Sequence, residues 1–266
     1  MYAVIPARNV SKRIGVAIQT VRFAGAEKII VVANGCEDST LQEARALREA
    51  DLTVICFREP LGFDVPRAVG AAYAYRQGAE HVLFYDGDLI GHHRHELQKL
   101  VADTVRFRLD LSLTDTYGTA HRLDVTRNPL LRLRSSLNRK LGLEPRLGLS
   151  SPSHGPHIVS RRLLRDIPAH YLAIPPLVLA YARQEGLTVD ALAHIPHSRL
   201  GSAHKEPAHF DKIRETIIGD LLEAHCLLEG RVRTREYRGH VFDGYHSERR
   251  FDLLDRFLNR LVKDTK

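Results

Sequence analysis

Two aspartates separated by one glycine follow an apolar run, and they are the residues of this chain best suited to chemistry. The run His81–Tyr85 leads directly into Asp86, Gly87 and Asp88. In an extended backbone, residues two apart point to the same side, so both carboxylates can face one cation, while Gly87 lets the chain bend. Such a pair at the end of a strand suits Mg²⁺ or Mn²⁺ that carries a phosphate group. The alternative is a solvated turn after a buried strand.

The segments before this pair alternate between strand-like and helix-like patterns. We expect strands over Tyr2–Ile5, Lys28–Ala33, Leu52–Phe57 and His81–Tyr85, and helices over Ile14–Phe23, Leu41–Glu49 and Val65–Gln77. Short, nearly continuous apolar strands between helices indicate an α/β fold whose parallel sheet is covered on both faces. Ligands of such sheets bind beyond the carboxyl ends of the strands, so functional residues should follow each strand.

Polar and small residues do follow each predicted strand. The first strand is followed by Pro6-Ala7-Arg8-Asn9, the second by Asn34–Thr40 and the fourth by the aspartate pair. The third leads through Gly62 to a helix of small residues whose amino end could receive a phosphate. In this order the motifs predict a nucleotide-binding crevice with a metal site at its rim.

In these motifs the chain resembles the nucleotide-sugar glycosyltransferases of the GT-A fold, particularly those of the family 2 type. The resemblance rests on V-I-P-A-R-N, V-V-A-N-G-C-E-D-S-T, the segment Gly62–Gly78 and F-Y-D-G-D-L. It implies a mixed, mostly parallel sheet flanked by helices. It also implies metal-dependent transfer of a sugar from a UDP- or GDP-linked donor to an unidentified acceptor, for which an anion is one option.

The resemblance also implies roles for single residues. The expected contacts to the nucleotide sugar are Pro6, Ala7, Arg8, Asn34, Asp38, Gly62, Arg67, Asp86 and Gly87. The implied ligands of the Mg²⁺ or Mn²⁺ ion are Asp86, Asp88 and a histidine after the last core strand, for which His197 is the candidate and His204 the alternative.

Two positions depart from the pattern of the family. Ala33 stands where an acidic residue is common, and Val65-Pro66 stands where Lys-Gly is frequent, so the identity of the base stays open. Arg67 or Arg8 could supply the missing positive charge near the diphosphate. The alternative for either arginine is a solvated residue on a helix surface.

The acceptor is expected to bind in the second half of the chain. After a predicted strand over Leu109–Leu113, a basic stretch runs to Arg139, and its leucines and arginines would form opposite faces of a helix. This basic face is either solvated or part of a site for an anionic acceptor. The predicted acceptor contacts are Arg122, His154, His157, Arg199 and Lys205. Histidines that only hydrogen-bond within a loop are the alternative for His154 and His157.

The catalytic base is not evident from the sequence. Inverting members of the family usually carry an acidic residue before the helix expected at Pro176–Gln184, where this chain has Ala173-Ile174-Pro175. Either the acceptor is an anion that needs no deprotonation, or the base comes from elsewhere, or the reaction retains configuration. Asp115 is the candidate substitute base, and Asp88 and Asp115 are the predicted catalytic residues.

We expect a catalytic domain over residues 1–205, with a nucleotide-binding half at 1–90 and an acceptor-binding half at 91–205, and a helical extension over 206–266. In the extension, helices are expected over Ala208–Glu229 and Ser247–Val262. Their apolar faces should pack on the catalytic domain; dimerisation of two identical chains and attachment to a membrane surface are the alternatives.

Composition narrows the class of protein. A formal charge of +7 over 266 residues favours anionic ligands. Nucleic acid is disfavoured because the basic residues are not interleaved with aromatic ones. The chain starts without a leader, its longest apolar stretch is broken by prolines, and its three cysteines lie far apart, which predicts a cytoplasmic protein, at most associated with the inner face of the membrane.

Two rival functions remain at this point. A nucleotidyltransferase can use a related sheet and the same metals, but the loop Pro6–Asn9 lacks the glycine-rich sequence of that class. A non-catalytic protein that binds sugar nucleotides is the other rival, and it is favoured by Ala33 and by the missing acid before Pro176. Slow release of nucleoside diphosphate from a bound donor would distinguish a catalyst from a binding protein.

Overall fold

The computed structural model describes residues 1–266 except 48, 119–124, 126, 203–205 and 264–266. The strands of its main sheet are β1 Tyr2–Ala7, β2 Lys28–Asn34, β3 Leu52–Phe57, β4 His81–Phe84, β5 Leu111–Asp115, β6 His157–Ser160 and β7 Val189–His194. The helices before β6 are α1 Ile14–Phe23, α2 Thr40–Ala46, α3 Val65–Arg76, α4 Arg94–Arg106, α5 Pro129–Lys140 and α6 Glu144–Leu147. Those after it are α7 Arg161–Asp166, α8 Pro175–Gln184, α9 His197–Leu200, α10 Pro207–Leu228 and α11 Phe251–Lys263. The 3₁₀ turns η2 Ala169–Ala173 and η3 His246–Glu248 and a hairpin of β8 Glu236–Tyr237 and β9 His240–Val241 complete the described elements.

The strands form one seven-stranded sheet in the order β3-β2-β1-β4-β6-β5-β7. β6 runs antiparallel to both of its neighbours, β4 and β5, whereas β1, β2, β3 and β4 are mutually parallel and β7 is parallel to β5. All strands except β6 therefore end at the same edge of the sheet. The fold is the predicted mixed, mostly parallel α/β sheet flanked by helices.

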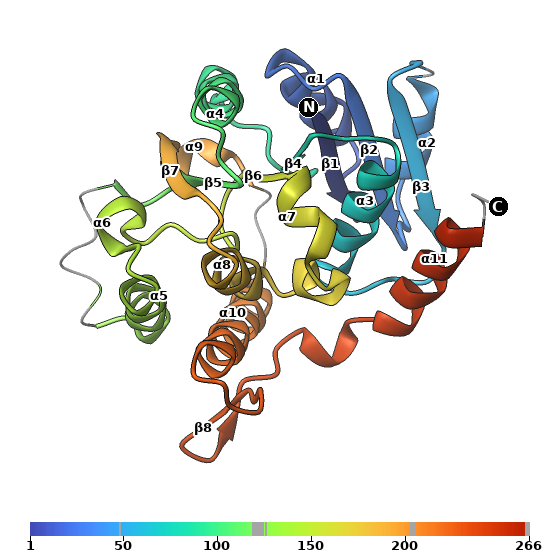
Figure 1. Ribbon diagram of the computed structural model, residues 1–266. Helices are drawn as coiled ribbons and strands as arrows, with labels where there is room; N and C mark the ends of the chain where they lie inside the picture. The colour runs from blue at the N-terminus through green and yellow to red at the C-terminus, as the bar shows by residue number, and fades with distance from the viewer. Residues whose placement is uncertain (48, 119–124, 126, 203–205, 264–266) are drawn as a thin grey trace.

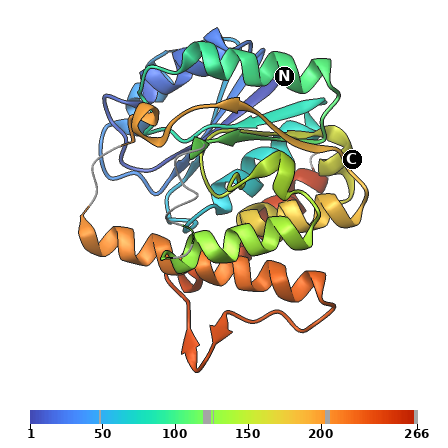
Figure 2. The same cartoon turned by 90° about the vertical axis from the view of Figure 1, so that its left-hand side faces the viewer.

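Helices cover both faces of the sheet (Figure 2). Along β1, Ala3 and Ile5 point to the face covered by α1, α2 and α4, and Val4 points to the opposite face. All three side chains are fully buried. Because side chains alternate along a strand, this double burial produces the continuous apolar runs that marked the strands in the sequence.

One strand of the sheet, β6, was not predicted from the sequence. His157–Ser160 forms β6, which pairs on one side with β4 and on the other with β5. Four residues carry too little periodicity to reveal a strand, and the partners of this one lie far away in the chain. Ser160, the last residue of β6, caps the following helix α7, because its hydroxyl accepts a hydrogen bond from the Leu163 N–H at 3.1 Å.

The C-terminal region wraps around the helical layer on one side of the sheet (Figure 1). α10 contacts α8 and α5, and α11 contacts α3. Between these two helices the β8–β9 hairpin projects from the body of the molecule. None of the helices that the structure describes combines the length and the apolar character needed to span a lipid bilayer.

Candidate functional site

The loops that carry the predicted site residues meet at the carboxyl edge of the sheet, as the motif order predicted. The segments after β1, β2, β4, β5 and β7 lie there, together with the loop that enters β6. In sheets of this kind that edge is where ligands bind.

The aspartate pair sits in a tight turn after β4. The Gly87 N–H donates to the Pro6 carbonyl at 3.1 Å, and the Leu89 N–H donates to the Asp86 carbonyl at 3.1 Å. A Cβ atom at position 87 would lie 3.0 Å from the Pro6 oxygen, so glycine lets this turn lie close against β1. The Asp86 side chain is 39% exposed, so part of it faces solvent.

Arg67, at the start of α3, binds Asp86 from the protein side. Its Nη2 lies 2.7 Å from Asp86 Oδ1 and its Nη1 lies 2.9 Å from Asp64 Oδ1. Burial opposes the charge of this guanidinium, but Asp86 and Asp64 more than offset that effect and raise its pKa, so it stays protonated. The side chain is buried, so the alternative of a solvated surface arginine is wrong for Arg67.

Three contacts hold the segment after β7 against the aspartate turn. Arg13 Nη1 donates to the carbonyls of Asp88 and Gly201, both at 3.0 Å. The Gly91 N–H donates to the Leu200 carbonyl at 3.0 Å, and no side chain would fit at position 91 because it would clash with the Arg199 carbonyl. These contacts bring α9, which begins at His197, next to the aspartate turn.

His197 belongs to a polar chain that leads into the acceptor half. His197 Nδ1 lies 2.9 Å from His154 Nε2, and His154 Nδ1 lies 2.9 Å from the Tyr117 hydroxyl. That hydroxyl accepts a hydrogen bond from Arg134 Nη1 at 2.7 Å. The contact with His154 engages Nδ1 of His197, so Nε2 is the nitrogen that can face a cation.

Two predicted acceptor residues are neutral imidazoles at neutral pH. Burial lowers the pKa of His154 to about 3, and the nearby charge of Arg134 acts in the same direction. Burial also lowers the pKa of His157 to about 3, with a smaller contribution from Arg67. His157 is buried against Phe84, with 4.9 Å between the ring centroids, so the structure places it beneath the site rather than on its surface.

The residues predicted to hold the nucleotide already have internal partners. The Asn34 amide accepts from the Leu61 N–H and donates to the Gly62 carbonyl, which fixes the loop after β3. Asp38 accepts from the backbone N–H of Ser11 and of Thr40, at 2.9 and 3.0 Å. These side chains fix the loops after β2 and β3, and their roles in binding a nucleotide stay predictions.

Other predicted residues are occupied elsewhere or lie outside the described part of the chain. Both Asp115 oxygens accept backbone N–H bonds from the following turn, and one of them lies 3.2 Å from His194 Nδ1. Arg199 pairs with Glu96 of α4 and donates to the His92 carbonyl. Arg122, His204 and Lys205 lie outside the described residues.

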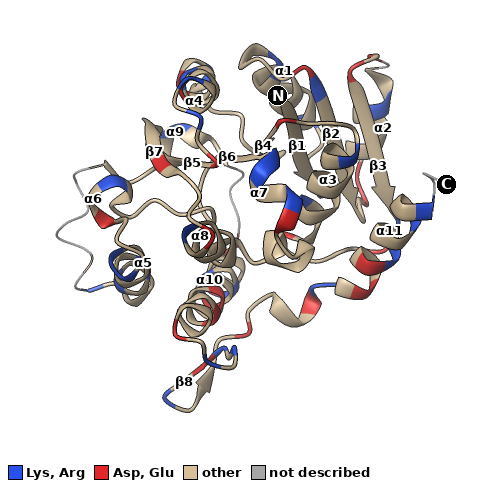
Figure 3. Cartoon of the chain, in the orientation of Figure 1, with Lys and Arg blue, Asp and Glu red and all other residues tan. Residues whose placement is uncertain are grey.

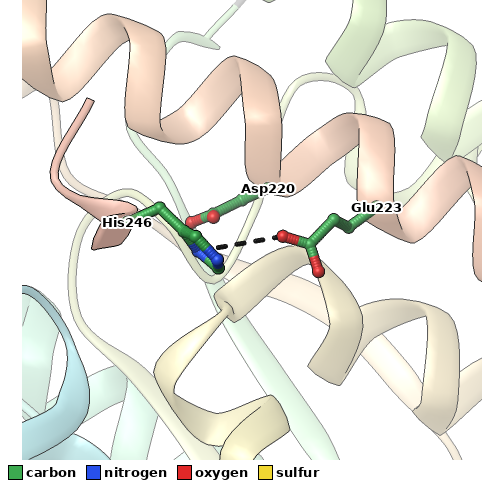
Figure 4. A group of neighbouring side chains, drawn as sticks. All are labelled: Asp220, Glu223 and His246. Carbon is green, nitrogen blue, oxygen red and sulfur yellow. Dashed lines mark ion pairs between the residues drawn. The ribbon is translucent and has the colours of Figure 1, made fainter. Parts of the chain in front are cut away.

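A second acidic cluster lies in the C-terminal region. Figure 4 shows Asp220 and Glu223 side by side on α10, with His246 facing them from a separate segment. Their potential ligand atoms all lie within 4.8 Å of one another, which is compatible with a metal ion. However, Arg235 and Arg249 already bind Asp220 at 2.6 and 2.7 Å, so guanidinium groups supply the positive charge there.

The sequence analysis missed Arg13, Asp64, Tyr117 and the special position of Arg134. Arg13 donates to the carbonyls of Asp88 and Gly201, and Asp64 pairs with Arg249 as well as with its neighbour Arg67. The partners that lie far away in the chain could not be found from any local pattern. The backbone of Asp64 adopts the left-handed conformation, with φ of 62°, and Asp64 is the turn residue immediately before α3. Arg134 was recognised only as one member of a basic face, whereas it is 1% exposed.

One family model matches more than half of this chain. The model of glycosyl transferase family 2 matches residues 2–167. A search of curated proteins found no match. The solved structures similar to this chain include a mycobacterial protein, with 22% identity, a TM-score of 0.58, and coverage of 84% of this chain and 74% of the other.

Two further similar structures are glycosyltransferases. Mannosyl-3-phosphoglycerate synthase from Rubrobacter xylanophilus matches with a TM-score of 0.61 and 15% identity over 90% of this chain and 77% of the other. The mannosyltransferase PcManGT from Pyrobaculum calidifontis, in complex with GDP-Man and Mn²⁺, matches with a TM-score of 0.56 and 16% identity over 99% of this chain and 72% of the other. At these identities the similarity establishes a shared fold.

Proposed function

The chain belongs to glycosyl transferase family 2 and is therefore a nucleotide-sugar glycosyltransferase, and from this premise we propose that it acts with a divalent cation, Mg²⁺ or Mn²⁺, held by Asp86, Asp88 and His197. The observation that carries the proposal is the turn at the carboxyl edge of the sheet, where the partly exposed side chain of Asp86 lies beside the segment that begins at His197.

The donor atoms at this turn fit such an ion. Two carboxylates and one neutral imidazole suit Mn²⁺ and are tolerated by Mg²⁺. The imidazole of His197 is oriented by His154, as second partners commonly orient metal-binding histidines. When bound, the ion would stabilise the negative charge that develops on the leaving diphosphate. A mannosyltransferase of similar fold binds GDP-Man and Mn²⁺.

The protein's own groups would prepare the donor for departure. Arg67 keeps one oxygen of Asp86 engaged, which fixes the carboxylate without neutralising its outer side. Exposed Arg8, at the end of β1, can meet the donor's phosphates from solvent. Interactions that are stronger with the separated diphosphate than with the intact donor lower the barrier to transfer.

We further propose that the acceptor is an anion, because Arg134 in the acceptor half is a buried cation for which the described residues supply no carboxylate partner. Arg134 is 1% exposed, and the described residues give it no ion pair, only the Tyr117 hydroxyl and ring. An unpaired charge is costly to bury, so a carboxylate or phosphate of the acceptor would be stabilised there. A carboxylate or phosphate oxygen would also need no general base to act as nucleophile, which fits the engaged state of Asp115.

The proposal is tested by measuring binding and turnover of a panel of UDP- and GDP-linked sugars, with Mn²⁺ and with excess chelator. We expect one donor to raise the melting temperature only with the metal present, and to release nucleoside diphosphate slowly without an acceptor. Binding and turnover that persist in chelator would contradict the metal-dependent mechanism. Binding without any release of nucleoside diphosphate, in the presence of anionic acceptors, would contradict catalysis.

A further inference from the structure

A chain of buried ion pairs runs from the aspartate turn into the C-terminal region. Arg67 bridges Asp86 and Asp64, with distances of 2.7 and 2.9 Å. The second oxygen of Asp64 lies 3.7 Å from Arg249 Nη2. Arg249 lies two residues before α11 and belongs to the region that follows the sheet domain, so this pair connects the site to a distant part of the sequence.

The far end of the chain of ion pairs is anchored on α10. Arg249 binds both oxygens of Asp220, at 2.7 and 2.8 Å, which is a bidentate contact. Arg235 binds Asp220 and Glu223, at 2.6 and 2.8 Å. The side chain of Arg249 is 0% exposed and that of Asp220 is 2% exposed. In such dry surroundings a guanidinium and a carboxylate hold each other firmly, and loss of one leaves the other unpaired. Acidic and basic residues alternate along this region in Figure 3.

The backbone of the C-terminal region also lies directly on the loop that carries Asp64. The Arg250 N–H donates to the Leu61 carbonyl at 2.8 Å, and Arg249 Nε donates to the Phe63 carbonyl at 3.2 Å. Gly62 has φ of +85°, and a side chain there would clash with the Glu248 carbonyl. The loop between β3 and α3 is therefore held between this segment and the amide of Asn34.

These contacts restrict the position of the Arg67 guanidinium. Asp64 is itself buried, so its carboxylate has few orientations in which both oxygens meet a cation. Arg249 places a positive charge 3.7 Å from one oxygen, beyond hydrogen-bond distance, while the other oxygen pairs with Arg67, whose second nitrogen binds Asp86. Without Arg249, Asp64 would have only Arg67 as a cation, and Arg67 could turn toward Asp64 and away from Asp86.

We propose that Asp64 and Arg249 are positioning residues for the donor site, through which the C-terminal region fixes Arg67 and thereby the Asp86 carboxylate. The inference rests on the proposed function, because Asp86 matters here as a ligand of the metal and of the donor. Partners that orient metal ligands typically change metal affinity or activity by about 10- to 100-fold when they are removed.

Four variants of the full chain test this inference: Arg249→Met, Asp64→Asn, the conservative Arg249→Lys, and Arg235→Met as the control. Arg235→Met removes an equally buried guanidinium from Asp220 but leaves the pair of Arg249 with Asp64 intact. Calorimetry with Mn²⁺ alone, and with GDP or UDP in the presence of Mn²⁺, gives the dissociation constants. Thermal unfolding of each variant gives its stability.

We expect Arg249→Met and Asp64→Asn to weaken binding of Mn²⁺ and of the Mn²⁺–nucleotide complex by about tenfold or more. Arg249→Lys should recover part of this loss, since it keeps the charge but not the bidentate geometry. Arg235→Met should lower the melting temperature as much as Arg249→Met while its binding stays within about twofold of the wild type.

The possible failures differ from one another. If the wild type binds neither nucleotide with Mn²⁺, the proposed function fails and the inference falls with it. If the wild type binds but Arg249→Met binds equally well, the inference alone is overturned. It is also overturned if Arg235→Met loses as much affinity as Arg249→Met, because the effect would then follow stability and not the contact with Asp64.

Discussion

The donor side and the acceptor side of the catalytic edge differ in how their buried charges are compensated. On the donor side, Arg67 lies between two carboxylates within 3 Å, and both carboxylates come from the protein. On the acceptor side, Arg134 is also deeply buried, but within the described part of the chain its partners are the hydroxyl and ring of Tyr117, and the histidine next in that chain is neutral.

This difference indicates which side is complete before a substrate binds. Preorganised charges lower the cost of reaching a transition state, because the protein does not reorganise during the reaction. The donor side has this property, since its ion pairs are formed internally. The acceptor side has an excess of positive charge, so we expect its electrostatics to be completed by the substrate.

The largest effect is expected from replacing an aspartate of the turn. Asp88→Ala should lower the rate of sugar transfer by at least about 10²- to 10³-fold, because the ion that stabilises the leaving diphosphate loses a ligand. Asp166→Asn, which removes an exposed carboxylate paired with Arg165, is the control and should leave the rate unchanged. Transfer assays at saturating Mn²⁺ measure the effect, and an unaltered rate in Asp88→Ala would remove this residue from the mechanism.

The next prediction compares the two buried arginines directly. Arg67→Met leaves Asp64 without its closest cation and Asp86 without its partner, so we expect the free energy of unfolding to fall by about 3–5 kcal/mol. Arg134→Met removes a buried cation to which the residues that the structure describes offer no carboxylate, so stability should stay within about 1 kcal/mol of the wild type or rise. Urea unfolding of both variants provides the measurement.

Equal destabilisation by the two substitutions would break the comparison. It would mean that the protein compensates the charge of Arg134 as well as that of Arg67, so the acceptor side would not need an anion from the substrate. A large loss in Arg134→Met alone would reverse the assignment of the two sides. The pair is well matched, because both side chains are long, buried and located in helices of the same face of the sheet.

A smaller effect is expected in anion binding. With inorganic phosphate as the probe and Mn²⁺–nucleotide present, Arg134→Gln should weaken phosphate binding by about tenfold, the loss of roughly one charge-assisted hydrogen bond. Binding of the nucleotide itself should not change. Phosphate affinity that is equal in the wild type and in Arg134→Gln would show that the guanidinium does not serve an anionic acceptor.

The donor half could be predicted well from sequence because its information is local. Each parallel strand is a short apolar run, and the residues that matter follow it directly, so the turn at Asp86 and its edge could be located without a structure. Gly87 was likewise recognisable as the residue that lets two carboxylates share a turn.

The remaining features depend on partners far apart in the chain. β6 is defined by ladders to β4 and β5, and the contact of Arg249 with the Phe63 carbonyl spans 186 residues. The burial of Arg134 depends on packing between α5 and its neighbours, and helical spacing alone showed only that basic residues share a face. Periodicity reports which side of an element is apolar, but it does not identify the tertiary partner of a single charged side chain.

The smallest effect concerns acid stability and the histidine beneath the site. Burial lowers the pKa of His157 to about 3 from an ordinary value of 6.5, against the opposing charge of Asp86 and in the same direction as Arg67. Since the unfolded chain binds this proton below pH 6.5 and the folded one does not, stability is fully present above that pH and falls as the pH decreases toward 3. The limiting slope is about 1.4 kcal/mol per pH unit for one such group.

His157→Phe should therefore reduce the acid dependence of unfolding between pH 6.5 and 4 while it keeps an aromatic ring against Phe84. His240→Gln, which changes an exposed histidine of the hairpin, is the control and should leave the slope as it is in the wild type. Urea midpoints across this range give the slopes. An unchanged slope in His157→Phe would mean that this imidazole is protonated in the folded chain. A buried positive charge would then lie below the donor and acceptor sides, and the comparison between the two sides does not include it.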